Sequence, residues 1–141
     1  MTETHRLQLV LLPGRYAVCR LPPEAGVPGW AAGDLVSVTH TADELSVVCH
    51  EDAVPAGVRR EGGWRCLRVA GALDFGMVGV LASLLVPLAG AGVSVFCLST
   101  FDTDYVMVRE IDLGASIAAL RSAGHEIAID GGKVLPSAGV E

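Results

Sequence analysis

The sequence predicts an α+β fold in which helices cover one face of an antiparallel sheet. The first observation is the order of apolar patterns in the second half of the chain, where strand-like and helix-like periods alternate as β-α-β-β-α-β. The second is composition: 51% of the 141 residues are hydrophobic and only 5% aromatic, so Val, Leu and Ala must form the core. The β-α-β-β-α-β order is that of a ferredoxin-like fold, and the length allows one compact domain or two small modules.

The first half reads as short strands without a proper helix. Two strand-like segments, 7–12 and 16–21, flank a Pro-Gly turn. The Pro- and Gly-rich segment 21–34 has room for no more than one helical turn near its Trp, and a hairpin follows over 35–51. The polar, Gly-rich segment 52–64 is the expected boundary between modules.

The second half is more regular. Asp112 is placed to cap a helix that Gly124 ends, and Pro87 should bend or shorten the last turn of the preceding helix. The expected elements are, in order, a strand over 66–71, a leucine-striped helix through 81–88, strands over 93–100 and 104–110, a helix over 113–124 and a strand over 126–129.

The run from Phe75 to Phe101 carries no charged residue and is long enough to cross a bilayer. Pro87, Gly90 and Gly92 interrupt it, and its second part is β-branched, so a helix, a turn and a buried strand fit better than a membrane span. The polar start of the chain contains no signal peptide. We therefore expect a cytoplasmic protein.

A weak internal repeat links the two hairpins. Residues 36–38 resemble 93–95 at an offset of 57 positions, and residues 45–48 resemble 105–108 at an offset of 60. The repeat predicts a duplicated module whose second hairpin loop is three residues longer. We expect three segments: a degenerate first copy of the module over 1–62, a complete second copy over 63–132 and a flexible tail over 133–141.

Several kinds of chemistry lack support in the sequence. The net charge of −6 argues against nucleic-acid and anionic-membrane partners. The four cysteines lack metal-site spacing and are expected to be buried free thiols, so no metal is predicted. The adjacent Cys49 and His50 should face opposite sides of a strand, and His40 and His50 lack the carboxylates of a metal site. No phosphate-binding motif is present, and we expect no cofactor.

The segment LDFGMVGVLASLLVPLAGAGVSVFCLSTFDTDYVMVRE, from Leu73 to Glu110, resembles the ACT-domain amino-acid-binding proteins. The resemblance is to the small tandem bacterial type related to the cytosolic arginine sensors of animals. It implies a sensory or regulatory protein rather than an enzyme. A free amino acid would then bind at an interface between ACT modules, and we expect a homodimer.

The resemblance also implies which residues contact the ligand. One segment precedes a helix whose N-terminal amides suit an α-carboxylate, and the other offers carboxylates for an α-ammonium group. The predicted ligand-binding residues are Leu73, Asp74, Phe75, Gly76, Met77, Val78 and Gly79, together with Ser99, Thr100, Phe101, Asp102, Thr103 and Asp104.

Structural interpretations stand beside these assignments. Asp74 is also an ordinary helix N-cap, and Asp102 and Asp104 are equally suited to Asx-type turns. The alternative function is a structural or protein-interaction module that responds to no ligand. The identity of the amino acid does not follow from the sequence.

Overall fold

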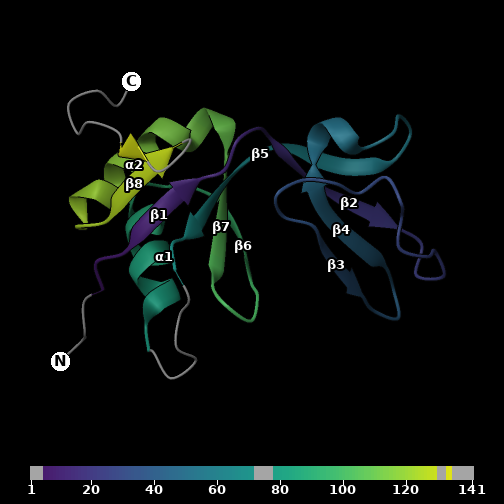
Figure 1. The fold of residues 1–141 in the computed structure, drawn as a ribbon, viewed down its shortest axis with the longest axis horizontal. Helices are drawn as coiled ribbons and strands as arrows, with labels where there is room; N and C mark the ends of the chain where they lie inside the picture. Colours follow the sequence, from purple (N-terminus) through teal and green to yellow (C-terminus); the bar gives the residue numbers. More distant parts are fainter. Residues whose placement is uncertain (1–4, 72–77, 130–132, 135–141) are drawn as a thin grey trace. The chain divides into compact units, whose positions relative to one another are not determined.

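A computed structural model describes the chain over residues 5–71, 78–129 and 133–134. It divides into two compact units (Figure 1). The small unit is Gly14–Trp64, and the large unit combines Met1–Pro13 with Arg65–Glu141. The long strand β5 (Arg59–Val69) contributes its first part to the small unit and its second part to the large unit.

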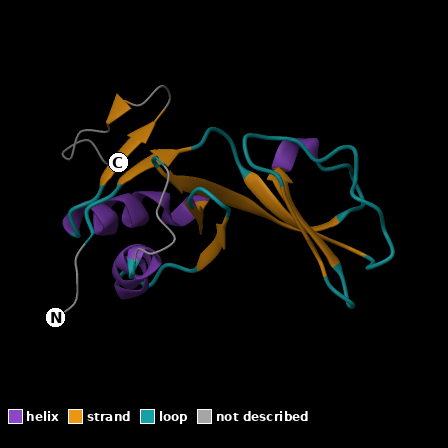
Figure 2. Ribbon diagram, turned by 60° about the horizontal axis from the view of Figure 1, so that its bottom comes forward, coloured by secondary structure: helices purple, strands orange, loops and turns teal. Residues whose placement is uncertain are grey.

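The large unit has the predicted ferredoxin-like order, strand–helix–strand–strand–helix–strand, beginning at β5. Its strands lie in the order β6-β7-β5-β1-β8-β9, and its two α-helices lie on one side of them (Figure 2). Its further elements are β1 (Gln8–Leu11), α1 (Val80–Gly90), β6 (Val95–Ser99), β7 (Asp104–Arg109), the 3₁₀ turn η2 (Glu110–Asp112), α2 (Leu113–Ser122), β8 (Glu126–Ile129) and β9 (Lys133–Val134).

The N-terminal strand belongs to the large unit, so the structure divides the chain differently from the boundary expected near residue 62. β1 lies between β5 and β8, antiparallel to the first and parallel to the second. Leu9 is opposite both Val69 and Ile127, and all three are at most 1% exposed. This apolar row is part of the buried cluster to which the helices α1 and α2 contribute Leu84 and other side chains. Burial of the row explains why β1 pairs here.

The small unit has the strand order of the same fold without its helices. Its elements are β2 (Tyr16–Leu21), β3 (Ser37–His40), β4 (Leu45–His50), the 3₁₀ turn η1 (Glu51–Ala53) and the first part of β5. The order is β3-β4-β2-β5, with every neighbouring pair antiparallel. The segment predicted as a polar boundary is therefore largely strand from Arg59 onward.

An irregular segment takes the place of a first helix in the small unit. The connection between β2 and β3 contains turns and no helix, and Ala25, Trp30 and Ala31 within it pack against the buried cluster around Val47. This connection covers residues 22–36, whereas residues 70–94 connect the corresponding strands of the large unit and include α1. A short, Pro- and Gly-rich connection favours turns over a helix.

The two hairpin turns are equal in length, which corrects the prediction of a longer second loop. Each contains four residues, 41–44 between β3 and β4 and 100–103 between β6 and β7. The first amide donates to the fourth carbonyl at 2.9 Å in both turns, Thr41 to Glu44 and Thr100 to Thr103. Equivalent residues of the two turns are thus 59 positions apart, both at the start (100 less 41) and at the end (103 less 44). The predicted offsets of 57 and 60 match residues of similar type rather than residues at equivalent positions in the two hairpins.

An ion pair also recurs in the two units. Arg15 Nε lies 3.5 Å from Glu51 Oε2 in the small unit, and Arg65 Nη1 lies 3.5 Å from Glu110 Oε1 in the large unit. Each glutamate is the first residue of the 3₁₀ turn that follows its hairpin, and Glu51 and Glu110 are again 59 positions apart. The repeated turn, ion pair and strand order support a duplicated module.

We predict that Leu9→Ala destabilises the large unit by about 2–5 kcal/mol, because it leaves a cavity in the central apolar row. Hydrogen exchange measured residue by residue should show lost protection in β8. The matched control is Leu45→Ala, which truncates a leucine that is 3% exposed in the small unit. Loss of protection in β2 and β4 alone on changing Leu9 would contradict the assignment of β1.

Candidate functional site

The second predicted segment forms the turn between β6 and β7. The Thr100 hydroxyl lies 3.3 Å from the Thr103 carbonyl oxygen, and the Thr103 amide lies 3.4 Å from the same hydroxyl. The Ser99 hydroxyl donates to Asp104 Oδ1 at 2.6 Å, and these two residues form the β6–β7 pair next to the turn. Threonine and serine side chains therefore stabilise this turn.

The outer residues of the turn face solvent. Phe101 is 80% exposed, and Asp102 is also exposed. The Asp104 carboxylate is half-buried and already accepts one hydrogen bond, which leaves further lone pairs for a ligand. The end of the hairpin, the turn together with the first residue of β7, therefore presents two carboxylates and an aromatic ring.

Thr103 connects this turn to the strand that leads into the first predicted segment. Its hydroxyl donates to the Val69 carbonyl oxygen at 2.9 Å, and the side chain is buried. Val69 is the last residue of β5, and the chain continues from it toward α1. The β6–β7 turn thus lies beside the end of β5 at which the chain leaves the sheet.

Only the last two residues of the first predicted segment are described; Leu73–Met77, including the candidate cap Asp74, lie outside the described residues. Val78 is exposed, and Gly79 precedes α1 with a left-handed φ of 80°. No side chain in the described part of the chain caps this helix, and its first turn contains no acidic residue. The amides of Val80, Leu81 and Ala82 therefore point out of the helix end without intrahelical partners.

A buried histidine, which the sequence did not single out, fixes the position of α1. Pro87 lies inside the helix and has no amide hydrogen, so it cannot donate to the Ser83 carbonyl four residues earlier. His125 Nε2 lies 3.0 Å from that carbonyl oxygen and replaces the missing donor. Of the two effects expected of Pro87, shortening does not occur, because the helix continues to Gly90.

The second ring nitrogen determines the tautomer of His125. The Leu7 amide donates to Nδ1 at 3.1 Å, and a backbone amide can act only as a donor. The proton therefore lies on Nε2 and points at the Ser83 carbonyl. The ring, which is 3% exposed, links the chain before β1 to α1.

The N-cap predicted for α2 at Asp112 is not found in the structure. Asp112 makes no side-chain capping bond to α2, because the 3₁₀ turn η2 runs directly into this helix. Instead, the Ser116 hydroxyl donates to the Asp112 carbonyl at 2.7 Å. Gly124 ends α2 as predicted, with a left-handed φ of 99°.

The cysteines do not form a nucleophilic site. Burial raises the pKa of Cys19 from its ordinary value of 9.0 to about 11 and that of Cys66 to about 12, and it also raises the pKa of Cys49. Cys97, which was expected to be buried, is exposed on β6. Across the described ranges, no group of three His, Cys, Asp or Glu side chains is placed to hold a metal ion.

Models of two domain families match adjacent parts of the chain. A sequence model of the ACT domain matches residues 59–122, and a model of an N-terminal domain matches residues 14–57. The second match coincides closely with the small unit.

The chain is similar to one solved protein over nearly its whole length. A structure from Agrobacterium tumefaciens is 37% identical and has a TM-score of 0.85, with 92% of this chain and 98% of the other covered. The regulatory subunit of aspartate kinase from Thermus thermophilus shares the fold at 12% identity, with a TM-score of 0.56 over 82% of this chain and 93% of the other.

The human cytosolic arginine sensor for mTORC1 subunit 1 is 37% identical over 59 residues, which are 41% of this chain and 18% of the sensor. The chain thus spans less than a fifth of the length of the curated relatives that it matches.

The large unit is an α+β domain of the ferredoxin type, with a hairpin turn held beside the end of β5. Residues 59–122 form a domain of the ACT family. No helix in its described residues is long and apolar enough to cross a membrane.

We predict non-additive effects at Pro87 and His125. His125→Leu should destabilise the protein, because the partly buried Ser83 carbonyl and Leu7 amide lose their partners, at a cost of about 1–3 kcal/mol each. In Pro87→Ala the helix supplies its own donor to Ser83, so the cost of His125→Leu should be about 1–3 kcal/mol smaller there. Urea unfolding of the four proteins measures this coupling. Additive changes would show that His125 does not replace the missing helix donor.

We also predict that thiol modification at pH 8 is confined at first to Cys97. Cys19 and Cys66 should react slowly in the folded protein, because burial limits access and their raised pKa values leave little thiolate. The folded state holds the Cys19 and Cys66 protons more tightly than the unfolded state does. The stabilisation from the two protonated thiols is therefore complete below pH 9, and it is lost as the pH rises toward about 11 for Cys19 and 12 for Cys66. Mass spectrometry of the labelled peptides checks the order, and equal rates for all four thiols would contradict it.

Proposed function

We propose that the protein is a non-enzymatic amino-acid sensor, with its ligand at the start of α1 and the turn between β6 and β7. The observation that carries the proposal is the buried hydrogen bond from Thr103 to the Val69 carbonyl. It holds the carboxylate-bearing turn beside the end of β5, from which the chain continues to α1, whose first turn no described side chain caps.

The two segments offer complementary partners for an amino acid. An α-carboxylate would accept from the amides of Val80, Leu81 and Ala82, where the helix dipole adds partial positive charge. An α-ammonium group would donate to the carboxylates of Asp102 and Asp104. Val78 and Gly79 lie beside these amides, and the glycine leaves the backbone open to a ligand.

The proposed site is completed by a second ACT module. An ACT dimer brings equivalent modules together, so we propose a homodimer in which the partner covers the exposed ligand. The human protein that is 37% identical over 59 residues is named as an arginine sensor, which supports an amino acid as the proposed ligand. Arginine is therefore included in any screen, although Asp102 and Asp104 suit an α-ammonium as well as a cationic side chain.

A protein-interaction module is the second candidate, and the exposed Phe101 favours it. An aromatic ring at the end of a hairpin is a typical anchor for a partner protein. This function predicts oligomerisation without any response to a small molecule.

We predict that one of the common amino acids raises the unfolding midpoint in a thermal-shift screen. A ligand at one hundred times its dissociation constant should stabilise the protein by about 2.7 kcal/mol. Asp102→Asn should reduce the shift, because it removes a carboxylate from the proposed ammonium site. Calorimetry with the same amino acid gives the change in affinity.

The repeat supplies a matched control. Asp43 occupies the position in the β3–β4 turn that Asp102 occupies in the β6–β7 turn, and both side chains are exposed. Asp43→Asn removes the same charge and should leave the ligand response unchanged. Absence of a response to every amino acid, or equal effects of the two substitutions, would refute the sensor proposal.

A further inference from the structure

The sheet of the small unit has one covered face and one open face. The covered face holds the buried cluster of Ala17, Cys19, Val47 and their neighbours, against which the irregular segment 22–36 packs. Side chains alternate along each strand, so the intervening residues point to the other face. On that face the register aligns a polar row across four strands, from Thr39 through Ser46 and Arg20 to Arg59.

Two arginines in this row are directly opposite each other. Arg20 on β2 pairs with Arg59 on β5, which places their Cβ atoms about 4.5–5.5 Å apart. Like charges in this position destabilise a sheet. Arg20 donates one bond, from Nη2 to the Asp43 carbonyl at 3.0 Å. Within the part of the chain that the structure describes, neither guanidinium forms an ion pair, and Arg59 makes no hydrogen bond.

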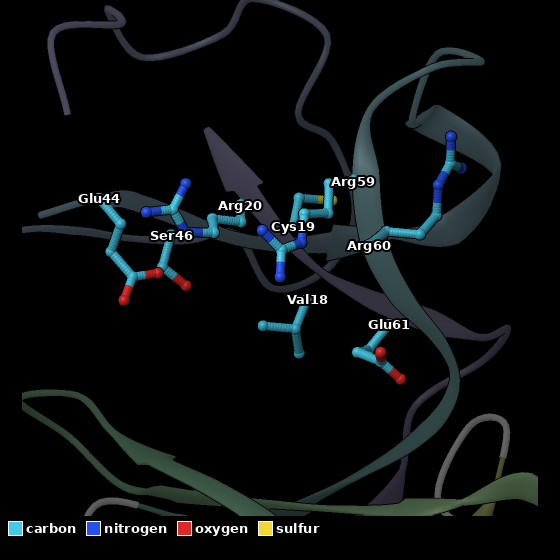
Figure 3. Close-up of a pocket in the computed structure, with 8 residues that line it drawn as sticks. All are labelled: Val18, Cys19, Arg20, Glu44, Ser46, Arg59, Arg60 and Glu61. Carbon is cyan, nitrogen blue, oxygen red and sulfur yellow. The ribbon is translucent and has the colours of Figure 1, made fainter. Parts of the chain in front are cut away.

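A neighbouring arginine shows what a structural role looks like in this unit. Arg60 points to the covered side and donates to the carbonyls of Val54, Pro55 and Val58. Figure 3 shows its side chain extending away from the group around Arg20 and Arg59. Arg60 thus holds the loop before β5, a role that the described contacts do not give to Arg59.

A pocket of ≈ 200 Å³ lies at the arginine pair. Figure 3 shows the side chains around it. Val18 provides an apolar wall, and the Ser46 hydroxyl is next to Arg20 in the same row. Glu44 and Glu61 line its margins. The volume suits a molecule of a few non-hydrogen atoms rather than a large cofactor.

We propose that this pocket binds a small oxyanion, a carboxylate or phosphate group, between Arg20 and Arg59. An oxyanion accepts hydrogen bonds from the planar donor forks of both guanidinium groups and removes their mutual repulsion. Ser46 supplies a further donor. The carboxylates of Glu44 and Glu61 repel extended polyanions, which limits the ligand to a compact anion. The pocket lies wholly in the small unit, so it is a second site that does not depend on the proposed amino-acid site.

Titration of the full chain with sodium acetate and sodium phosphate, followed by amide NMR at constant ionic strength, tests this proposal. Saturable shifts should be confined to the strand segments 18–20, 44–46 and 59–61, and the two anions show whether a carboxylate or a phosphate is preferred. Arg59→Gln should weaken binding at least about tenfold, because it removes one charge-assisted donor set. The same variant should unfold at no lower temperature than the unchanged protein, since it relieves a like-charge contact.

Arg6→Gln is the matched control, because Arg6 is exposed in the large unit and its loss changes the net charge equally. It should leave anion binding unchanged. Absence of saturable shifts at millimolar anion, shifts spread over all arginines, or unaltered binding by Arg59→Gln would each overturn the proposal. An amino-acid response at residues 99–104 reports on the other site, so each proposal fails or stands by its own signals.

Discussion

The large unit depends on the insertion of the N-terminal strand between β5 and β8. Without β1 these two strands would each lack a neighbour, and the row formed by Val69, Leu9 and Ile127 would lose its central member. Ordering a strand that is distant in sequence costs conformational entropy, which the burial of these apolar side chains must exceed. The ACT domain of this chain is therefore completed by residues from before the small unit.

That insertion also determines how α1 is held. Leu7 immediately precedes β1, and its amide fixes the His125 ring, whose other nitrogen donates to Ser83 in α1. Through this ring the inserted strand reaches the helix turn that Pro87 deprives of a backbone donor. The first turn of α1 is consequently positioned by two parts of the chain, around Leu7 and His125, that are far from it in sequence.

The sequence predicted the elements of the large unit well because their periods are distinct. The strand over Glu126–Ile129 and the helix stop at Gly124 appear as expected. The place of β1 could not be predicted, because an apolar alternation such as that around Leu9 does not specify its partner strands. His125 was overlooked for a similar reason, since its partners Leu7 and Ser83 are remote. The one signal in the sequence was Pro87, whose lack of an amide hydrogen leaves the Ser83 carbonyl in need of a donor from elsewhere.

The duplication explains why the two units offer different chemistry. In the large unit a long connection includes α1, whose first turn no described side chain caps, and the hairpin end carries Asp102 and Asp104. In the small unit the connection is too short and too rich in Pro and Gly for a helix, so no helix dipole is available to attract an anion. Its equivalent turn closes with the same hydrogen bond, from Thr41 to Glu44, but the positive charge lies instead on the open sheet face. In a chain with a net charge of −6, two arginines facing each other across strands require a reason, and an anion between them is the simplest physical one.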